Sequence, residues 1–218
     1  MEYAKVKAET SDEVNNMDSV IKKAEKWMRI RFSEDKTGHD FEHLARVART
    51  AAKLQATEGG NALVIQLAAL FHDYPDEKLV SNTNLAKEEL IKWMEGEKLS
   101  PNVINDIMRA INAVSYRGGS NPIQAISIEE KIVQDADRLD ALGAIGIIRA
   151  FTYGASKKQA PLDYACENAE STLQHFDDKL FKLKNLMNTK SALAMAKDRH
   201  EYMQLFIEQL KKEDVIKR

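Results

Sequence analysis

The chain has 218 residues, with 32 basic and 34 acidic side chains and a formal net charge of −2. Hydrophobic residues make up 44% and charged residues 30%, which is typical of a folded protein with a hydrophobic core and argues against a disordered chain. The near-neutral balance gives no electrostatic reason to expect nucleic acid or a membrane surface as the partner.

Cys166 is the one cysteine, which excludes an intramolecular disulfide and is usual for a protein of a reducing compartment. The first residues lack the apolar core of a secretory signal. No window approaches the roughly 18 apolar residues of a transmembrane helix. We therefore expect a cytoplasmic protein without a membrane partner.

The sequence of the first half of the chain predicts three helices after a polar N-terminal segment. Only 9 Gly and 4 Pro interrupt the sequence, and apolar residues recur with helical spacing almost throughout. We expect residues 1–16 to form a flexible N-terminal tail and residues 17–218 to form one all-α domain. The predicted helices run from about 20 to 33, from 41 to 58 before Gly59-Gly60, and from 61 to about 73 before Pro75. The third is nearly all apolar, so we expect it to be buried on most sides.

The second half continues the helical pattern, and the sequence contains no repeat, low-complexity segment or domain linker. Ser100-Pro101 is a helix start, with serine as the N-cap and proline in the first turn. The expected helices are a surface helix over 84–95, one from 101 to about 115, one over 128–153 with a bend near Leu139-Asp140, and two long helices after about 163 that break near 187–189.

One His-Asp pair stands at the end of the most apolar helix. A carboxylate at Asp73 is costly in such surroundings unless a cation compensates it, and a metal ion beside His72 removes that cost. The alternative is that the pair merely ends the helix. Two further features favour the metal: His43 lies in the first turn of the preceding helix, and Asp137 lies on an apolar helix downstream.

This arrangement resembles the HD-domain metal-dependent phosphohydrolases, whose signature is H…HD…D on separate helices. The matching residues are His43, the pair His72-Asp73, and Asp137. The flanking segments 38–43 (GHDFEH) and 134–143 (QDADRLDALG) resemble a stand-alone bacterial branch, and the resemblance covers roughly residues 18–210. It implies a single-domain helical HD fold with a metal site in the core of the bundle, held by these four residues.

The identity of the fourth ligand is the open point in this set. Asp137 fits the family pattern best, and Asp135 and Asp140 are the alternatives. Helical spacing places Asp137 and Asp140 on one face and Asp135 well away from it. Asp140 is then either an acid that orients a ligand or a solvated surface charge.

Two imidazoles and two carboxylates suit a six-coordinate divalent ion. Manganese is the first choice, and magnesium, iron, nickel and zinc remain open. The sequence has no histidine between Asp73 and His175, so we expect one ion and not two. His39 precedes His43 by four residues and reaches the ion only if its loop allows it.

Other residues near the signature are candidates for catalysis and phosphate binding. Asp76 and Glu77 follow the pair within one turn, where related enzymes place a carboxylate beside the attacking water; the alternative is a solvated loop. The candidate phosphate-binding cations are Arg46, Lys78, Arg117 and Arg138.

Two histidines near the C-terminus lie outside this pattern. We expect His175 to have a structural role on its helix. His200 stands in the polar run KDRHE, so we expect it to be exposed.

The leading functional hypothesis is hydrolysis of a small nucleotide, and the family branch implies a manganese-dependent nucleoside triphosphate pyrophosphohydrolase. The alternatives are a nucleoside monophosphate phosphomonoesterase, a non-catalytic nucleotide sensor, and a helical scaffold in which the histidines are incidental. The expected partner is a small phosphate substrate, and nothing in the sequence indicates a particular oligomeric state.

Overall fold

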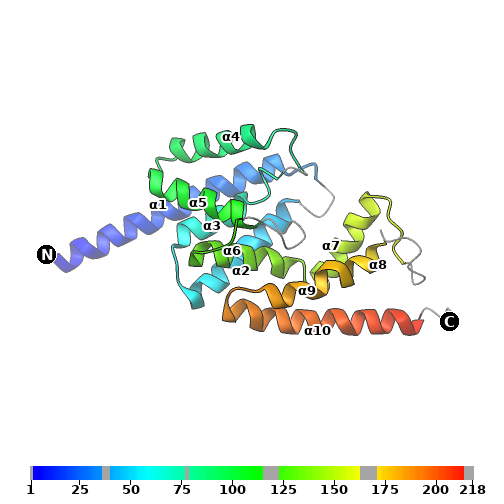
Figure 1. Ribbon diagram of the computed structural model, residues 1–218. Helices are drawn as coiled ribbons and strands as arrows, with labels where there is room; N and C mark the ends of the chain where they lie inside the picture. The colour runs from blue at the N-terminus through cyan, green and yellow to red at the C-terminus, as the bar shows by residue number, and fades with distance from the viewer. Residues whose placement is uncertain (1, 36–39, 77–78, 115–122, 163–170, 214–218) are drawn as a thin grey trace.

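The computed structural model describes residues 2–35, 40–76, 79–114, 123–162 and 171–213, and within these ranges the chain is all-α (Figure 1). The predicted fold class is confirmed. The elements are α1 Glu2–Arg31, α2 Phe41–Glu58, α3 Ala62–Phe71, α4 Thr83–Gly96, α5 Pro101–Val114, α6 Ile128–Asp140, α7 Gly143–Ser156, α8 Thr172–His175, the π-helix η2 Phe176–Leu180, α9 Phe181–Leu183, the 3-10 helix η3 Lys184–Leu186, and α10 Lys190–Glu213.

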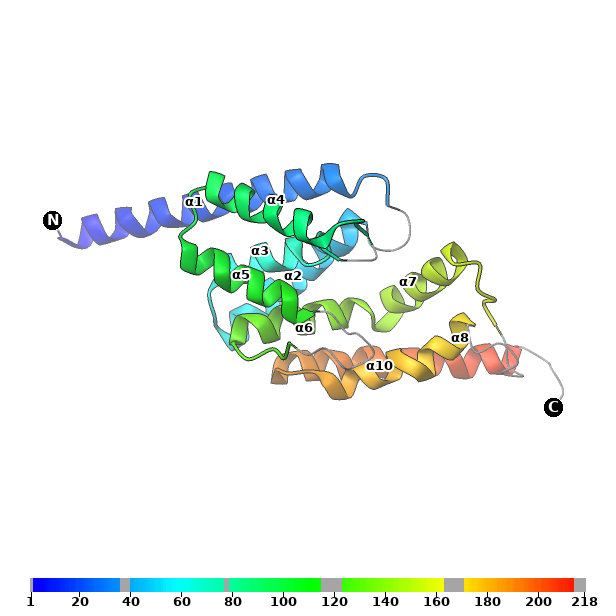
Figure 2. The same ribbon diagram turned by 45° about the horizontal axis from the view of Figure 1, so that its top comes forward.

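The N-terminal segment differs from its prediction. Residues 2–16, expected to be part of a flexible tail, form the first half of α1, which projects beyond the other helices (Figures 1 and 2). The segment contains no Gly or Pro and is rich in Ala, Glu and Lys, which favour the helix. The polarity of the segment does not exclude a helix, because a polar segment of good helix formers can extend a helix whose other half is packed against the protein. The domain boundary at residue 17 stays a prediction.

Helix α3 is the centre of the bundle, as its apolar sequence predicts. It contacts α1, α2, α5 and α6. Its residues Val64, Ile65 and Leu67 to Phe71 are all buried. An aromatic group joins it to the outer helices: the ring centroids of Trp27 on α1 and Trp93 on α4 are stacked 5.4 Å apart, and Phe71 meets both edge-on. The end of α3 is therefore held firmly in the core.

Side-chain caps fix where the helices of the site begin. The Asp40 carboxylate accepts a hydrogen bond from the backbone N–H of His43, 2.9 Å away, at the start of α2. The Asn61 side chain caps α3 in the same way, accepting from the backbone N–H of Val64. Ser127 and Glu130 form a complete capping box on α6. These caps set the register in which the later residues of each helix face the core.

The predicted bend near Leu139-Asp140 is a break between α6 and α7. Gly143 has φ +74°, a left-handed conformation that favours glycine, and the side chain of Arg199 on α10 lies against it. Arg199 also donates a hydrogen bond to the carbonyl of Leu139. A β-carbon on Gly146 would lie 2.3 Å from the carbonyl oxygen of Ala141, so the turn needs glycine there as well.

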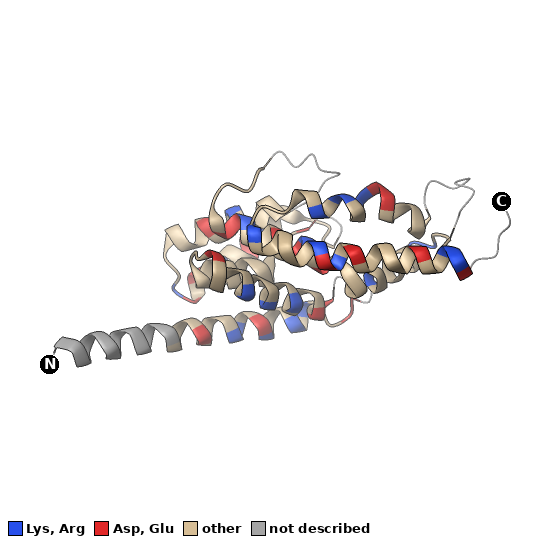
Figure 3. Ribbon diagram, turned by 90° about the horizontal axis from the view of Figure 1, so that it is seen from below, with Lys and Arg blue, Asp and Glu red and all other residues tan. Residues whose placement is uncertain are grey.

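Helices α7 to α10 form a second group of helices beside α1–α6 (Figures 1 and 2). Helix α10 contacts α2, α6 and α7. The predicted break near residues 187–189 is confirmed between η3 and α10. Basic and acidic residues are interspersed along the described helices, as the net charge suggests (Figure 3). Within the described ranges, no helix is long and apolar enough to cross a membrane.

The prediction that His200 is exposed is wrong. Its exposed fraction is 6%, and its ring packs edge-on against Phe181 with centroids 5.3 Å apart. The physical reason is helical spacing, because His200 continues the buried row formed by Ala192, Ala196, Met203 and Ile207.

Candidate metal centre

Four predicted residues come together from three helices. His43 is in the first turn of α2, His72 is the C-cap of α3, Asp73 follows it, and Asp137 lies in the last turn of α6. Helices α2, α3 and α6 pack against one another. The site therefore forms where the start of one helix meets the ends of two others.

His43, His72 and Asp73 form a buried cluster that could hold a metal ion. The Nε2 atoms of the two histidines are 3.2 Å apart. The Oδ2 atom of Asp73 is 3.3 Å from Nε2 of His43, and its Oδ1 atom is 3.3 Å from Nε2 of His72. Imidazole nitrogens and carboxylate oxygens are common ligands of divalent transition metals, so the donor set fits such an ion.

Asp137 lies at the same place but is more open to solvent. Its Oδ1 atom is 3.5 Å from Nε2 of His43 and of His72. Its side chain is 29% exposed, against 11% for Asp73. The accessible side of the cluster is thus the side of Asp137.

The charges of the cluster depend on one another. Burial disfavours a charged imidazole, yet the carboxylates of Asp73 and Asp137 raise the pKa of His72 to about 9. Burial likewise opposes the charge on Asp137, but the two histidines lower the pKa of Asp137 to about 2. The two acids thus favour a cation between them, whether a proton or a metal ion.

The Nδ1 atom of each histidine contacts an oxygen atom on the side of the ring away from the cluster. The Nδ1 atom of His72 is 2.8 Å from the carbonyl oxygen of Ala69. The Nδ1 atom of His43 is 2.7 Å from Oδ2 of Asp140, which has an exposed fraction of 4%. This burial excludes a solvated surface charge at Asp140, and the role of an acid that orients a ligand stays a prediction.

Asp140 also binds two arginines. Nε of Arg46 is 2.8 Å from Oδ1, its Nη2 atom is 3.0 Å from Oδ2, and Nη1 of Arg149 is 3.3 Å from Oδ2. Burial opposes ionisation, but the hydrogen bonds from His43 and Arg46 hold the pKa of Asp140 below its usual value. Sequence reasoning missed Arg149, because the predicted bend near Leu139-Asp140 does not tell in which direction the next helix runs. Gly143 and Gly146 were the available signal for that bend.

Asp135, the other alternative ligand, forms hydrogen bonds away from the cluster. Its carboxylate is fully buried and accepts hydrogen bonds from the backbone and side chains of Asn188 and Thr189, each at 2.8 Å. It thereby fixes the start of α10 to α6. The structure thus places Asp137 at the cluster and Asp135 at a helix junction.

The remaining predicted site residues are only partly described. Asp76 is half-buried, and its backbone N–H donates to the carbonyl of Asp73, 3.1 Å away. Arg138 donates a hydrogen bond to the carbonyl of Leu186. His39, Glu77, Lys78 and Arg117 lie outside the described residues. The catalytic and phosphate-binding roles of all these residues stay predictions.

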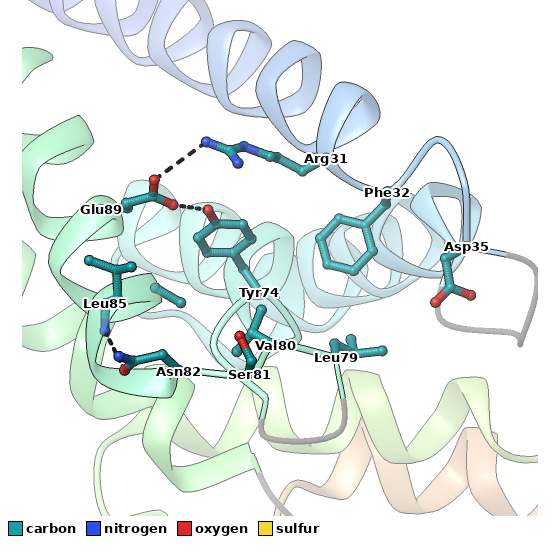
Figure 4. Close-up of a pocket in the computed structure, with 11 residues that line it drawn as sticks. Arg31, Phe32, Asp35, Tyr74, Leu79, Val80, Ser81, Asn82, Leu85 and Glu89 are labelled. Carbon is teal, nitrogen blue, oxygen red and sulfur yellow. Dashed lines mark hydrogen bonds and ion pairs between the residues drawn. The ribbon is translucent and has the colours of Figure 1, made fainter.

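A cavity of about 330 Å³ lies between the end of α1, the segment that follows Asp73, and α4 (Figure 4). Tyr74 and Phe32 line it, and at its rim the Tyr74 hydroxyl donates to Glu89, which pairs with Arg31 at 3.6 Å. None of the four proposed ligands lines this cavity.

Comparison with known proteins identifies the family. The HD-domain family model matches residues 40–142. YpgQ of Bacillus subtilis is 36% identical over 197 residues, which cover 88% of this chain and 94% of YpgQ. The chain belongs to the HD-domain superfamily. The pair His72-Asp73 lies within the matched range, and its role as the signature pair stays a prediction.

Several solved structures have a similar fold. The Lin1889 protein of Listeria innocua has a TM-score of 0.77 and 41% identity, over 93% of this chain and 99% of that one. An HD-superfamily hydrolase of Bacillus thuringiensis has a TM-score of 0.75 and 36% identity, over 92% and 100%. YpgQ in complex with ADP has a TM-score of 0.77 and 32% identity, over 90% and 98%.

Proposed function

We propose that this HD-superfamily protein is a divalent-metal-dependent phosphohydrolase that acts on a small nucleotide. The observation that carries the proposal is the convergence of the His43 and His72 Nε2 atoms, 3.2 Å apart, with the Asp73 carboxylate on both. Asp137 completes the proposed ligand set from the solvent side. Manganese is the proposed ion because the resembled family branch implies it, and the donor set is also compatible with magnesium, iron, nickel or zinc.

The nucleotide is proposed from one relative and from the charges near the cluster. YpgQ has been solved with ADP, and it covers most of this chain. Phosphate groups require cations, and Arg46 and Arg149 lie beside the cluster with side chains 26% and 16% exposed. These two guanidinium groups are the described candidates for phosphate contact, and Lys78, Arg117 and Arg138 remain further candidates.

The chemistry of the proposed reaction divides between the ion and the protein. A divalent ion in this site supplies a Lewis acid for a phosphoryl oxygen and lowers the pKa of water. Asp76 accepts the proton of the attacking water, Glu77 being the alternative, and the arginines orient the phosphate. The bond proposed to break joins the α- and β-phosphates of a nucleoside triphosphate, which yields a monophosphate and pyrophosphate.

The test is a panel of nucleoside mono-, di- and triphosphates incubated with the manganese-loaded protein, with phosphate and pyrophosphate measured separately. Pyrophosphate from triphosphates is the expected product. Phosphate from monophosphates alone would replace the proposal with a phosphomonoesterase. Nucleotide binding without any product would indicate a sensor. A His72→Ala variant serves as the control for contaminating phosphatases, because it should be inactive in every arm.

A further inference from the structure

Asp140 joins three helices at one buried carboxylate. It stands at the end of α6 and accepts from His43 and Arg46 on α2, with Arg149 of α7 at 3.3 Å. The carboxylate is thus the point at which a proposed metal ligand and two cations meet.

The contact to His43 determines which ring nitrogen faces the cluster. A carboxylate only accepts hydrogen bonds, so the 2.7 Å contact requires a proton on Nδ1 of His43. The lone pair of the neutral ring then lies on Nε2, which points toward His72 and Asp73. A histidine ligand commonly donates its second N–H to a carboxylate, which fixes its tautomer and its orientation.

The contacts to the arginines tie the cations to the same carboxylate. Arg46 binds both oxygens, so its guanidinium plane is fixed relative to Asp140. Arg149 approaches the oxygen that also accepts from His43. A displacement of Asp140 therefore moves a ligand and two cations together.

We propose that Asp140 is the positioning residue of the metal centre, which turns Nε2 of His43 toward the ion and holds Arg46 and Arg149 beside it. The proposal rests on the proposed function in one respect, namely that His43 is a metal ligand. Asp140 contacts the Nδ1 side of the imidazole, whereas Nε2 faces the cluster, so Asp140 would not itself be a ligand.

A purely structural role for Asp140 predicts that its substitution lowers stability without a specific effect on the metal centre. Asp135 provides a matched control for this alternative. Asp135 is on the same helix, is fully buried, and accepts several hydrogen bonds from Asn188 and Thr189. An asparagine at either position places an amide donor opposite existing donors, so both variants lose stability. Only Asp140→Asn should also alter the metal centre.

The first measurement is Mn²⁺ affinity by titration calorimetry, at a temperature where thermal unfolding shows each variant to be folded. We expect Asp140→Asn to weaken binding by about 10- to 100-fold, the usual effect of removing a carboxylate behind a histidine ligand. Asp135→Asn should stay within about threefold of wild type, and Asp140→Glu should recover part of the affinity. Unchanged affinity in Asp140→Asn, or equal weakening in both Asn variants, would overturn the proposal.

The second measurement needs no metal. In the metal-free protein, the ¹⁵N chemical shifts of the neutral His43 ring should show the proton on Nδ1 in wild type and in Asp135→Asn. In Asp140→Asn the proton should be distributed over both nitrogens. If the wild-type protein binds no Mn²⁺, the proposed function is contradicted. The ¹⁵N shifts then still test whether Asp140 fixes the tautomer of His43. A wild-type proton on Nε2 would contradict the positioning role.

Discussion

The Nε2 atoms of His43 and His72 lie 3.2 Å apart where the start of α2 meets the end of α3. Histidine ligands commonly lie about 2.1 Å from a bound ion, so two nitrogens at this separation would both reach one divalent ion. The two rings therefore need little movement to bind one ion. Without metal, a proton between the carboxylates and the rings satisfies the same geometry, so protons and metal compete for the site.

This competition predicts that metal affinity rises with pH. Burial opposes the charge, but the carboxylates of Asp73 and Asp137 raise the pKa of His72 to about 9 in the metal-free protein. Below that pH an ion must displace one proton, so the apparent Mn²⁺ affinity should rise about tenfold per pH unit. Calorimetry in buffers of different ionisation enthalpy should show the release of about one proton. A pH-independent affinity would contradict the assignment of His72.

The same pKa shift predicts how the stability of the metal-free protein depends on pH. The folded pKa of His72 is raised above the unfolded value of about 6.5, so its charged form stabilises the fold. That stabilisation is fully present below about pH 6.5 and is lost as the pH rises to about 9. Urea unfolding of chelator-treated protein should show this loss, and His72→Gln should lack it.

Removal of Asp73 should abolish both metal binding and activity. Its carboxylate is the one that lies 3.3 Å from both histidines, so Asp73→Ala removes a shared negative charge from the cluster. Metal analysis should find far less than one ion per chain. Asp106→Ala, at an exposed position on α5, is the control and should keep the metal. Full occupancy in Asp73→Ala would show that the ligand set is wrong.

The proposed role of Asp76 can be tested apart from metal binding. Asp76→Asn preserves the shape of the side chain but removes its ability to accept a proton. Turnover should fall by about 10²-fold or more, the scale of general-base catalysis, with metal occupancy near wild type. A change below about threefold would be typical of a solvated loop residue. An equal loss in Glu77→Gln would mean that the two carboxylates share the role.

A side chain at Gly146 should destabilise the turn between α6 and α7. A β-carbon there meets the backbone of Ala141 at 2.3 Å, and that backbone directly follows Asp140. Gly146→Ala should therefore cost about 1–3 kcal/mol of stability. Gly96→Ala, at the end of α4 with nothing within 4 Å, should be neutral or slightly stabilising. Thermal unfolding of both variants checks this, and equal melting temperatures would contradict the account of the turn.

The existence of the helices was predictable from the sequence because it depends on local patterns, and the candidate metal cluster was predictable because of the family resemblance. The apolar run 62–71 predicts a buried helix, and the family signature selects His43, His72 and Asp73. Caps such as Asn61 and breakers such as Gly59 mark the boundaries because their chemistry acts within a few residues.

The features that the sequence did not predict depend on how elements far apart in the sequence are arranged in space. The direction of α7 after Gly143 brings Arg149 back to Asp140, and no periodicity reports that direction. The π-helix of residues 176–180 likewise has no local signal that we recognised. At His200 the sequence did contain a local signal, because its helical spacing from Ala192, Ala196 and Met203 indicates burial. The polar residues beside it in the sequence led to the wrong prediction of exposure.

The most direct test of the central claim is a titration of chelator-treated protein with Mn²⁺, in which nucleoside triphosphate hydrolysis and bound metal are measured in the same samples. We expect no hydrolysis without metal, a rise in rate in proportion to bound ion, and a plateau at about one ion per chain. The Asp137→Ala variant should bind the ion more weakly and reach its plateau only at higher Mn²⁺. Hydrolysis at the full rate by the metal-free protein, or an unchanged titration in Asp137→Ala, would contradict the account.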